Sequence, residues 1–127
     1  MNDMDENTKN NEFINHLGLE IIEESSKYAK GRIPVKAELL NPFGTMHGGV
    51  LYSLADIVAG IAAQESGNRC VTLSGSLNFL LPGTDTKYIY CEAFLERMGK
   101  HTAVYRVEIK DDEGKLLDTV TFTYFSI

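Results

Sequence analysis

Between residues 13 and 40, the pattern of apolar and polar positions predicts one short helix followed by two strands. Apolar residues between positions 13 and 17 share one helical face, and Gly18 follows where a helix would end. Residues 19–24 and 31–40 have the composition of strands. The turn residues 41–44, with the sequence Asn-Pro-Phe-Gly, then predict that the chain leaves the sheet.

The rest of the sequence predicts one long helix and four consecutive strands. Residues 47–64 are mostly good helix formers, and Gly67 and Asn68 follow as stop signals. The later segments are rich in Val, Ile, Thr, Tyr and Phe, as strands are, and they cover residues 69–81, 86–98, 101–110 and 116–126. We therefore expect an α+β fold in which an antiparallel sheet packs on one helix.

Length and composition are those of a single globular domain. The chain has 127 residues, which we divide into a flexible tail, 1–12, and one domain, 13–127. A net charge of −6 argues against a nucleic-acid partner. Without an export signal or an apolar segment of bilayer length, we expect a cytoplasmic protein with no membrane partner. We then expect Cys70 and Cys91 to be reduced thiols in the core. The two cysteines lack the clustered spacing of a zinc site, so no metal site is expected.

One face of the predicted long helix departs from its otherwise apolar character. Its small or polar residues, spaced four, three, four and four apart, are Gly49, Ser53, Asp56, Gly60 and Gln64. Small residues allow another backbone to approach closely, and an acid among apolar neighbours needs a partner or a function. No Lys or Arg stands three or four positions from Asp56, so a donor elsewhere, water or substrate must satisfy it. A purely structural buried acid is the competing interpretation.

The turn into this helix offers a second candidate site. Gly48 and Gly49 would leave first-turn N–H groups free for an anion or oxyanion, or they could merely permit tight packing. His47 at a helix N-terminus is better suited to orienting the loop as a neutral ring than to proton transfer. Asn41 is either a turn former or an amide that holds a water or a carbonyl oxygen.

The spacing of these candidates along the helix bears on assembly. Gly48 and Asp56 are eight residues apart, or ~12 Å along a helix axis, which is too far for both to contact one carbonyl group. If two such helices pack antiparallel about a two-fold axis, the glycine end of one meets the acid of the other. We therefore expect a homodimer with two composite sites.

These residues resemble a known family, the hotdog-fold acyl-CoA thioesterases of the phenylacetyl-CoA thioesterase type. The resemblance covers roughly residues 15–126 and is carried by Asn41, Gly44, His47-Gly48-Gly49, Ser53-Leu54, Asp56, Asn78-Phe79-Leu80 and Pro82. It implies a curved antiparallel sheet wrapped around one long central helix. It also implies a dimer with a continuous sheet, often paired into a tetramer, and hydrolysis of an acyl-CoA thioester.

The resemblance also implies roles for individual residues. Asp56 would be the general base or nucleophile, Gly48 the oxyanion donor, Asn41 the group that positions water or the thioester oxygen, and His47 the residue that shapes the loop. Thr72 would assist from the next strand, although a short preceding loop leaves Ser74 as a competitor.

Substrate contacts and cofactors complete these expectations. The remaining substrate-binding candidates are Gly49, Ser53, Arg97 and Lys100, the last two because coenzyme A carries several negative charges. Lys87 is a further basic candidate. No cofactor is expected, since coenzyme A belongs to the substrate.

Two other function classes remain open at this point. A non-catalytic acyl-CoA or fatty-acyl binding protein would have no need of an acid that faces the thioester. A hotdog dehydratase would pair a His with a Glu further along the helix, where this chain has Asp56.

Overall fold

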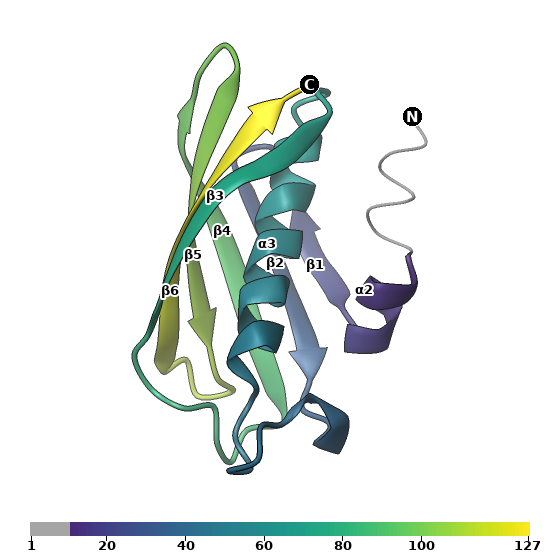
Figure 1. The fold of residues 1–127 in the computed structure, drawn as a ribbon, viewed down its shortest axis with the longest axis vertical. Helices are drawn as coiled ribbons and strands as arrows, with labels where there is room; N and C mark the ends of the chain where they lie inside the picture. The colour runs from purple at the N-terminus through teal and green to yellow at the C-terminus, as the bar shows by residue number, and fades with distance from the viewer. Residues whose placement is uncertain (1–10) are drawn as a thin grey trace.

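The computed structural model describes residues 11–127, which form one antiparallel sheet around a central helix (Figure 1). The six strands lie in the order β1-β2-β4-β5-β6-β3. Their bounds are β1 Glu20–Glu24, β2 Tyr28–Pro34, β3 Cys70–Phe79, β4 Tyr88–Met98, β5 Thr102–Lys110 and β6 Leu116–Ser126. The predicted α+β architecture, a curved antiparallel sheet wrapped around one long helix, is confirmed.

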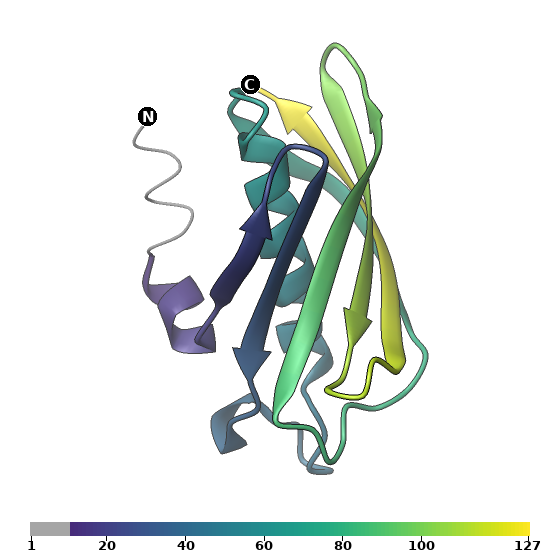
Figure 2. The same cartoon turned by 180° about the vertical axis from the view of Figure 1, so that it is seen from behind.

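The long helix, α3 (Gly48–Gln64), lies in the concave face of the sheet, which covers it when the molecule is seen from behind (Figures 1 and 2). Its apolar residues are buried against side chains from β2, β4, β5 and β6. Leu54, Val58 and Ala59 are fully buried on α3, as are Ile89 and Val107 on the facing strands. Because the sheet curves around the helix, α3 is open to solvent mainly on one side, where Gly49, Ser53, Asp56 and Gly60 lie together with partly exposed apolar residues.

The beginning of the described chain follows the predicted order with two differences. Helix α2 (Glu12–Leu17) ends at Gly18, whose φ of 76° is the left-handed conformation that glycine adopts readily. It begins one position earlier than the boundary predicted for the domain, because the Asn11 side chain accepts a hydrogen bond from the Ile14 N–H and caps the helix. Residues 1–10 of the predicted tail lie outside the described residues.

The second difference concerns the predicted strand 31–40, which was wrong at both ends. Strand β2 begins at Tyr28 and ends at Pro34, and residues 37–39 form a 3₁₀ turn, Ala37–Leu39, instead of continuing the strand. Leu39 is buried in the core from this irregular segment, and Val35 and Leu40 pack against the core while partly exposed. Apolar residues that contact the core from a loop therefore had the composition of a strand in the sequence.

Strand β3 forms one edge of the sheet and pairs only with β6 within the described chain. A register shift between Thr72 and Ser74 marks a bulge in this strand. The strand leaves apolar side chains exposed, with Leu73 and Phe79 61% and 60% accessible. A long edge strand with exposed apolar residues is a surface suited to pairing with another chain.

Candidate active site

The carboxylate of Asp56 lies on the open face of α3 and is held by two hydroxyl groups from the sheet. Its Oδ1 accepts a 2.7 Å hydrogen bond from the Thr72 hydroxyl and a 2.9 Å hydrogen bond from the Tyr124 phenol. Thr72 stands on β3 and Tyr124 on β6, and the two residues are direct partners in the register of these strands. The partners that the sequence left unassigned are thus two neutral donors, with no cation.

Of the two hydroxyl candidates on β3, the structure brings only Thr72 to Asp56. The bulge that follows Thr72 shifts the register, so that Ser74 pairs with Thr123. No hydrogen bond joins Ser74 to Asp56.

Sequence reasoning did not single out Tyr124. Its position in a run of Thr, Tyr and Phe is typical of a core strand, and the residue is indeed 2% exposed. Burial, followed by the neighbouring Asp56, raises the pKa of the Tyr124 phenol well above its usual value. The phenol therefore stays protonated and serves as a hydrogen-bond donor at neutral pH.

The N-terminus of α3 presents one free backbone donor. His47 is the N-cap, and its Nδ1 accepts a 2.9 Å hydrogen bond from the Gly49 N–H. The Gly48 N–H has no acceptor among residues 11–127. Of the two glycine N–H groups considered in the sequence, only that of Gly48 is left available to an oxyanion.

Asn41 organises the loop that precedes α3. Its Oδ1 accepts hydrogen bonds from the N–H groups of Phe43 and Thr45, at 2.9 and 3.1 Å, and its Nδ2 donates to the Thr45 hydroxyl at 2.7 Å. An amide nitrogen carries two protons, so one Nδ2 proton remains after this contact. Asn41 is a turn former, as one interpretation of the sequence required, and it retains a donor.

Two separate cavities contain the candidate groups. Asn41 and Gly48 line a cavity of about 330 Å³ together with Phe79. Asp56 and Thr72 line another cavity, of about 340 Å³, and the two cavities share no residue. A single chain therefore does not bring the Gly48 N–H and the Asp56 carboxylate to one substrate atom.

The residues predicted to bind substrate are dispersed over the chain. Gly49 and Ser53 line a third cavity, of about 370 Å³, and the Ser53 hydroxyl donates to the Gly49 carbonyl oxygen at 2.8 Å. Arg97 and Lys100 are exposed at the β4–β5 hairpin, at the end of the sheet opposite to the start of α3 (Figure 1). Within one chain, none of the four lines the cavity that contains Gly48.

Gln64 is the one residue of the small and polar face that the structure removes from the open surface. It is 9% exposed, and its side chain exchanges hydrogen bonds with the backbone of Cys70, from Nε2 at 2.8 Å and to Oε1 at 3.3 Å. Gln64 thus fixes the start of β3 to the end of α3.

A second aspartate, Asp118 on β6, lies inside the core. It is fully buried, and neither carboxyl oxygen has a hydrogen-bond partner in the described chain. Desolvation by this burial raises the pKa of Asp118 to about 7. Sequence reasoning did not single out Asp118, which stands within the predicted strand 116–126.

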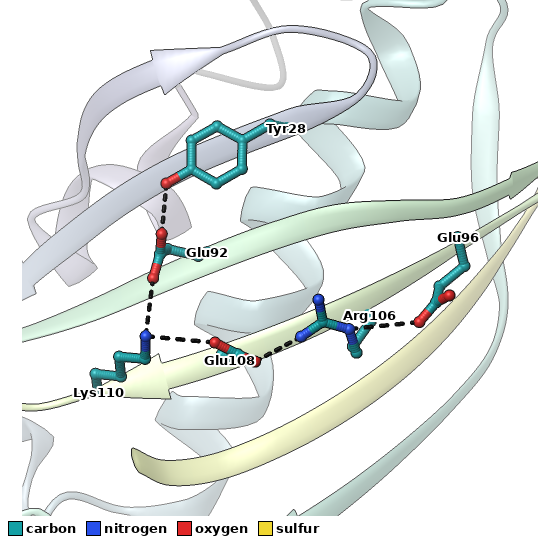
Figure 3. A network of polar contacts seen from close by, with 6 residues as sticks. All are labelled: Tyr28, Glu92, Glu96, Arg106, Glu108 and Lys110. Carbon is teal, nitrogen blue, oxygen red and sulfur yellow. Dashed lines mark hydrogen bonds and ion pairs between the residues drawn. The ribbon is translucent and has the colours of Figure 1, made fainter. Parts of the chain in front are cut away.

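The outer face of the sheet carries an extended polar network, which Figure 3 shows in detail. The Tyr28 phenol donates to Glu92 at 2.5 Å, and Lys110 bridges Glu92 and Glu108 at 3.4 Å each. Burial alone would raise the pKa of Glu92, but the hydrogen bonds from Tyr28 and Lys110 outweigh it and lower the pKa. The network continues through Arg106 to Glu96. Because these carboxylates have partners and lie away from α3, we regard the network as structural.

The described residues hold neither a cluster of three His, Cys, Asp or Glu side chains able to bind a metal nor a helix long and apolar enough to cross a membrane. Both cysteines, Cys70 and Cys91, are free and buried.

Comparison with known proteins shows the family to which the chain belongs. The sequence model of the thioesterase superfamily matches residues 43–117. The acyl-coenzyme A thioesterase PaaI of Escherichia coli K12 is 33% identical over 99 residues, which cover 78% of this chain and 71% of PaaI.

Solved structures are similar over most of the chain. The E. coli PaaI protein from the phenylacetic acid degradation operon has a TM-score of 0.88 and 29% identity, and the match covers 94% of this chain and 86% of that chain. A hypothetical thioesterase of Streptococcus pneumoniae with coenzyme A has a TM-score of 0.82 and 29% identity, over 86% of this chain and 85% of that one. Structures of the latter protein also exist with an aspartate or a threonine replaced by alanine.

Proposed function

The chain belongs to the thioesterase superfamily and is a hotdog-fold thioesterase, and we propose that it hydrolyses acyl-CoA thioesters at sites shared between two chains. The observation that carries this proposal is the separation of two complementary half-sites on α3. One half-site has a free N–H at Gly48, and the other has a carboxylate at Asp56. In the proposed dimer, the Gly48 end of one chain faces Asp56 of the second chain.

The proposed chemistry assigns a different task to each half-site. The Gly48 N–H stabilises the negative charge that develops on the thioester oxygen, and Asn41 orients the substrate or a water through its remaining Nδ2 proton. Asp56 either removes a proton from a water that attacks the carbonyl carbon, or attacks that carbon itself. In both cases the carbon–sulfur bond breaks, and coenzyme A leaves as a thiolate that takes up a proton. When Asp56 attacks, the acyl group is left on its carboxylate as a mixed anhydride, which water then hydrolyses to the free acid and the original carboxylate.

The exposed surface of the chain supports a dimer that completes these sites. Edge strand β3 presents exposed apolar side chains, among them Leu73 and Phe79. The open face of α3 includes three small residues, Gly49, Ser53 and Gly60, that permit close approach of a second helix. Pairing the β3 strands of two chains would join the two sheets and cover the β3 edge of each. A tetramer, as a dimer of such dimers, is a further expectation of the resemblance.

Similar proteins support both the substrate class and the acidic half-site. Coenzyme A is bound in the Streptococcus pneumoniae structure, and the E. coli relative is an acyl-coenzyme A thioesterase. In the Streptococcus protein the replaced aspartate precedes the replaced threonine by sixteen positions, which is also the separation of Asp56 and Thr72. On this proposal the basic residues Arg97 and Lys100 attract the phosphates of coenzyme A.

Release of free thiol from a panel of aryl, short-chain and long-chain acyl-CoAs tests the proposal. We expect the wild-type protein to release coenzyme A from at least one class. Stoichiometric binding of acyl-CoA without thiol release would instead identify a binding protein. After a single turnover in H₂¹⁸O, label in the protein carboxylate would identify attack by Asp56, because water that opens the anhydride at the Asp56 carbonyl carbon leaves its oxygen there, whereas general-base catalysis places ¹⁸O only in the released acid.

A further inference from the structure

We propose that Tyr124 is a positioning residue for the reaction: with Thr72 it binds one oxygen of Asp56 and leaves the other oxygen to react. This inference rests on the proposed function, because it takes Asp56 as the group that acts on the thioester. It assigns a task to a core residue of β6 that carries no signal in the sequence.

The two hydroxyl donors meet at a single carboxylate oxygen. The Thr72 hydroxyl lies 2.7 Å and the Tyr124 phenol 2.9 Å from Oδ1 of Asp56. The same phenol lies 2.8 Å from the backbone oxygen of Asp56, so it is anchored to the helix as well as to the side chain. Oδ2 accepts no hydrogen bond from residues 11–127, and Asp56 lines an open cavity. Rotation of the carboxylate is thus restrained, while Oδ2 keeps its lone pairs for a water or a substrate.

Packing fixes the position of the Tyr124 ring. The ring is 2% exposed and lies edge-on to Tyr105 and tilted against Phe122, each with 6.0 Å between ring centroids. The Tyr105 phenol is itself held by a 2.6 Å hydrogen bond to the Ser26 carbonyl oxygen. A donor supported in this way keeps its direction during turnover, which is what preorganised catalysis requires of a supporting residue.

The protonation state of Tyr124 favours positioning over acid catalysis. Burial and the nearby Asp56 raise the pKa of the phenol, and the other titratable groups that face it are Cys91 and Tyr105. Burial raises the pKa of each of these two groups as well, so both are neutral at the pH of an assay. A phenol that holds its proton this firmly is a poor acid for a departing thiolate but a constant hydrogen-bond donor.

The test compares two isosteric substitutions, Tyr124→Phe and Tyr105→Phe. Each removes one buried phenol hydroxyl: that of Tyr105 contacts the Ser26 carbonyl oxygen, whereas that of Tyr124 contacts both the backbone oxygen and Oδ1 of Asp56. For Tyr124→Phe we expect kcat to fall about tenfold with little change in KM, the size expected for a lost hydrogen bond to a charged group. For Tyr105→Phe we expect the kcat and KM of the wild-type protein. Thermal unfolding of the two variants reports any loss of stability.

The outcomes separate this inference from the function on which it rests. Equal kcat and equal KM for the two variants would overturn the positioning role of Tyr124 while leaving an inactive Asp56→Asn variant, and hence the proposed function, in place. Absence of thiol release by the wild-type protein, or full activity of Asp56→Asn, would overturn the proposed function and this inference together.

Discussion

Asp56 and Asp118 are the same type of acid, but they differ in solvent access and in hydrogen-bond partners. Asp56 lies on the half-open face of α3, where the hydroxyls of Thr72 and Tyr124 contact one of its oxygens. Asp118 lies fully buried on β6, and neither of its oxygens has a partner among the described residues. Tyr124 stands on the same strand as Asp118 and faces the same core, but at the other end of the strand.

This comparison shows that burial of an aspartate does not by itself make it suited to catalysis. An acid without donors in an apolar core is most stable as the neutral form, which explains the raised pKa of Asp118. An acid with hydrogen-bond donors on one oxygen and solvent access on the other can reach a substrate. Partners and access, and not burial alone, are therefore the properties on which we propose Asp56 as the functional aspartate.

The largest effect that we predict is on the pH dependence of stability, and it belongs to Asp118. The pKa of Asp118 is about 7 in the folded state, whereas an unfolded Asp titrates near ~3.9. The folded state therefore binds more protons between these values, and the free energy of unfolding falls as pH rises through this range. Relative to Asp118→Asn, the wild-type protein should lose about 3 kcal/mol of stability between pH 5 and pH 8.

Urea unfolding of both proteins at several pH values measures this difference. A constant difference between wild type and Asp118→Asn across this pH range would show that Asp118 has a partner or an ordinary pKa. Thiol release by Asp118→Asn at a pH where it is folded should equal that of the wild-type protein.

The same substitution at Asp56 should affect turnover far more than stability. We expect Asp56→Asn to lower kcat by at least ~100-fold, a typical loss for an acid–base or nucleophilic group. Its stability at a given pH should stay close to that of the wild-type protein, because Asn can still accept hydrogen bonds from Thr72 and Tyr124 through its amide oxygen. Steady-state thiol release and thermal unfolding on the same preparation test both statements. A folded variant with undiminished turnover would remove Asp56 from the reaction.

The Gly48 half-site can be tested by removing its N–H group. Gly48 is the first residue of α3, where proline is tolerated, and His47 has φ −63° and ψ 133°, which suit a residue before proline. Gly48→Pro should lower kcat about 100-fold. Gly48→Ala is the matched control, because its new Cβ meets the same Phe79 ring, at 2.9 Å, but keeps the N–H. Equal losses in the two variants would assign the effect to this contact and not to an oxyanion donor.

The smallest predicted effect concerns the packing of the open face of α3. A Cβ at Gly60 would meet only Tyr124, at 3.8 Å, so the chain itself has room for a small side chain there. Gly60→Leu should weaken self-association by about 2 kcal/mol through overpacking, while Gly60→Ala should weaken it less. Sedimentation equilibrium measures the dissociation constants. An unchanged constant for the Leu variant would place the dimer contact elsewhere.

The helix that carries Asp56 could be predicted from the sequence, whereas the partners of Asp56 and the burial of Asp118 depend on how distant strands pair. The α3 pattern and the missing cation near Asp56 identified the helix and the acid, because both are local. The pairing of Thr72 with Tyr124 depends on two strands 52 residues apart in the chain and on a bulge after Thr72, which local pattern does not encode. For the same reason Asp118 could not be recognised as buried, and residues 35–40 were mistaken for strand.

Complementation between inactive variants tests most directly whether the site is shared between two chains. Gly48→Pro and Asp56→Asn are each expected to be nearly inactive, because every site of either homodimer lacks one group. After an equimolar mixture is denatured and refolded, about half of the dimers should be heterodimers with one intact site of two, so activity should return to about a quarter of wild type. If native mass spectrometry shows heterodimers but the mixture is no more active than its parents, the Gly48 N–H and Asp56 do not act across a dimer interface.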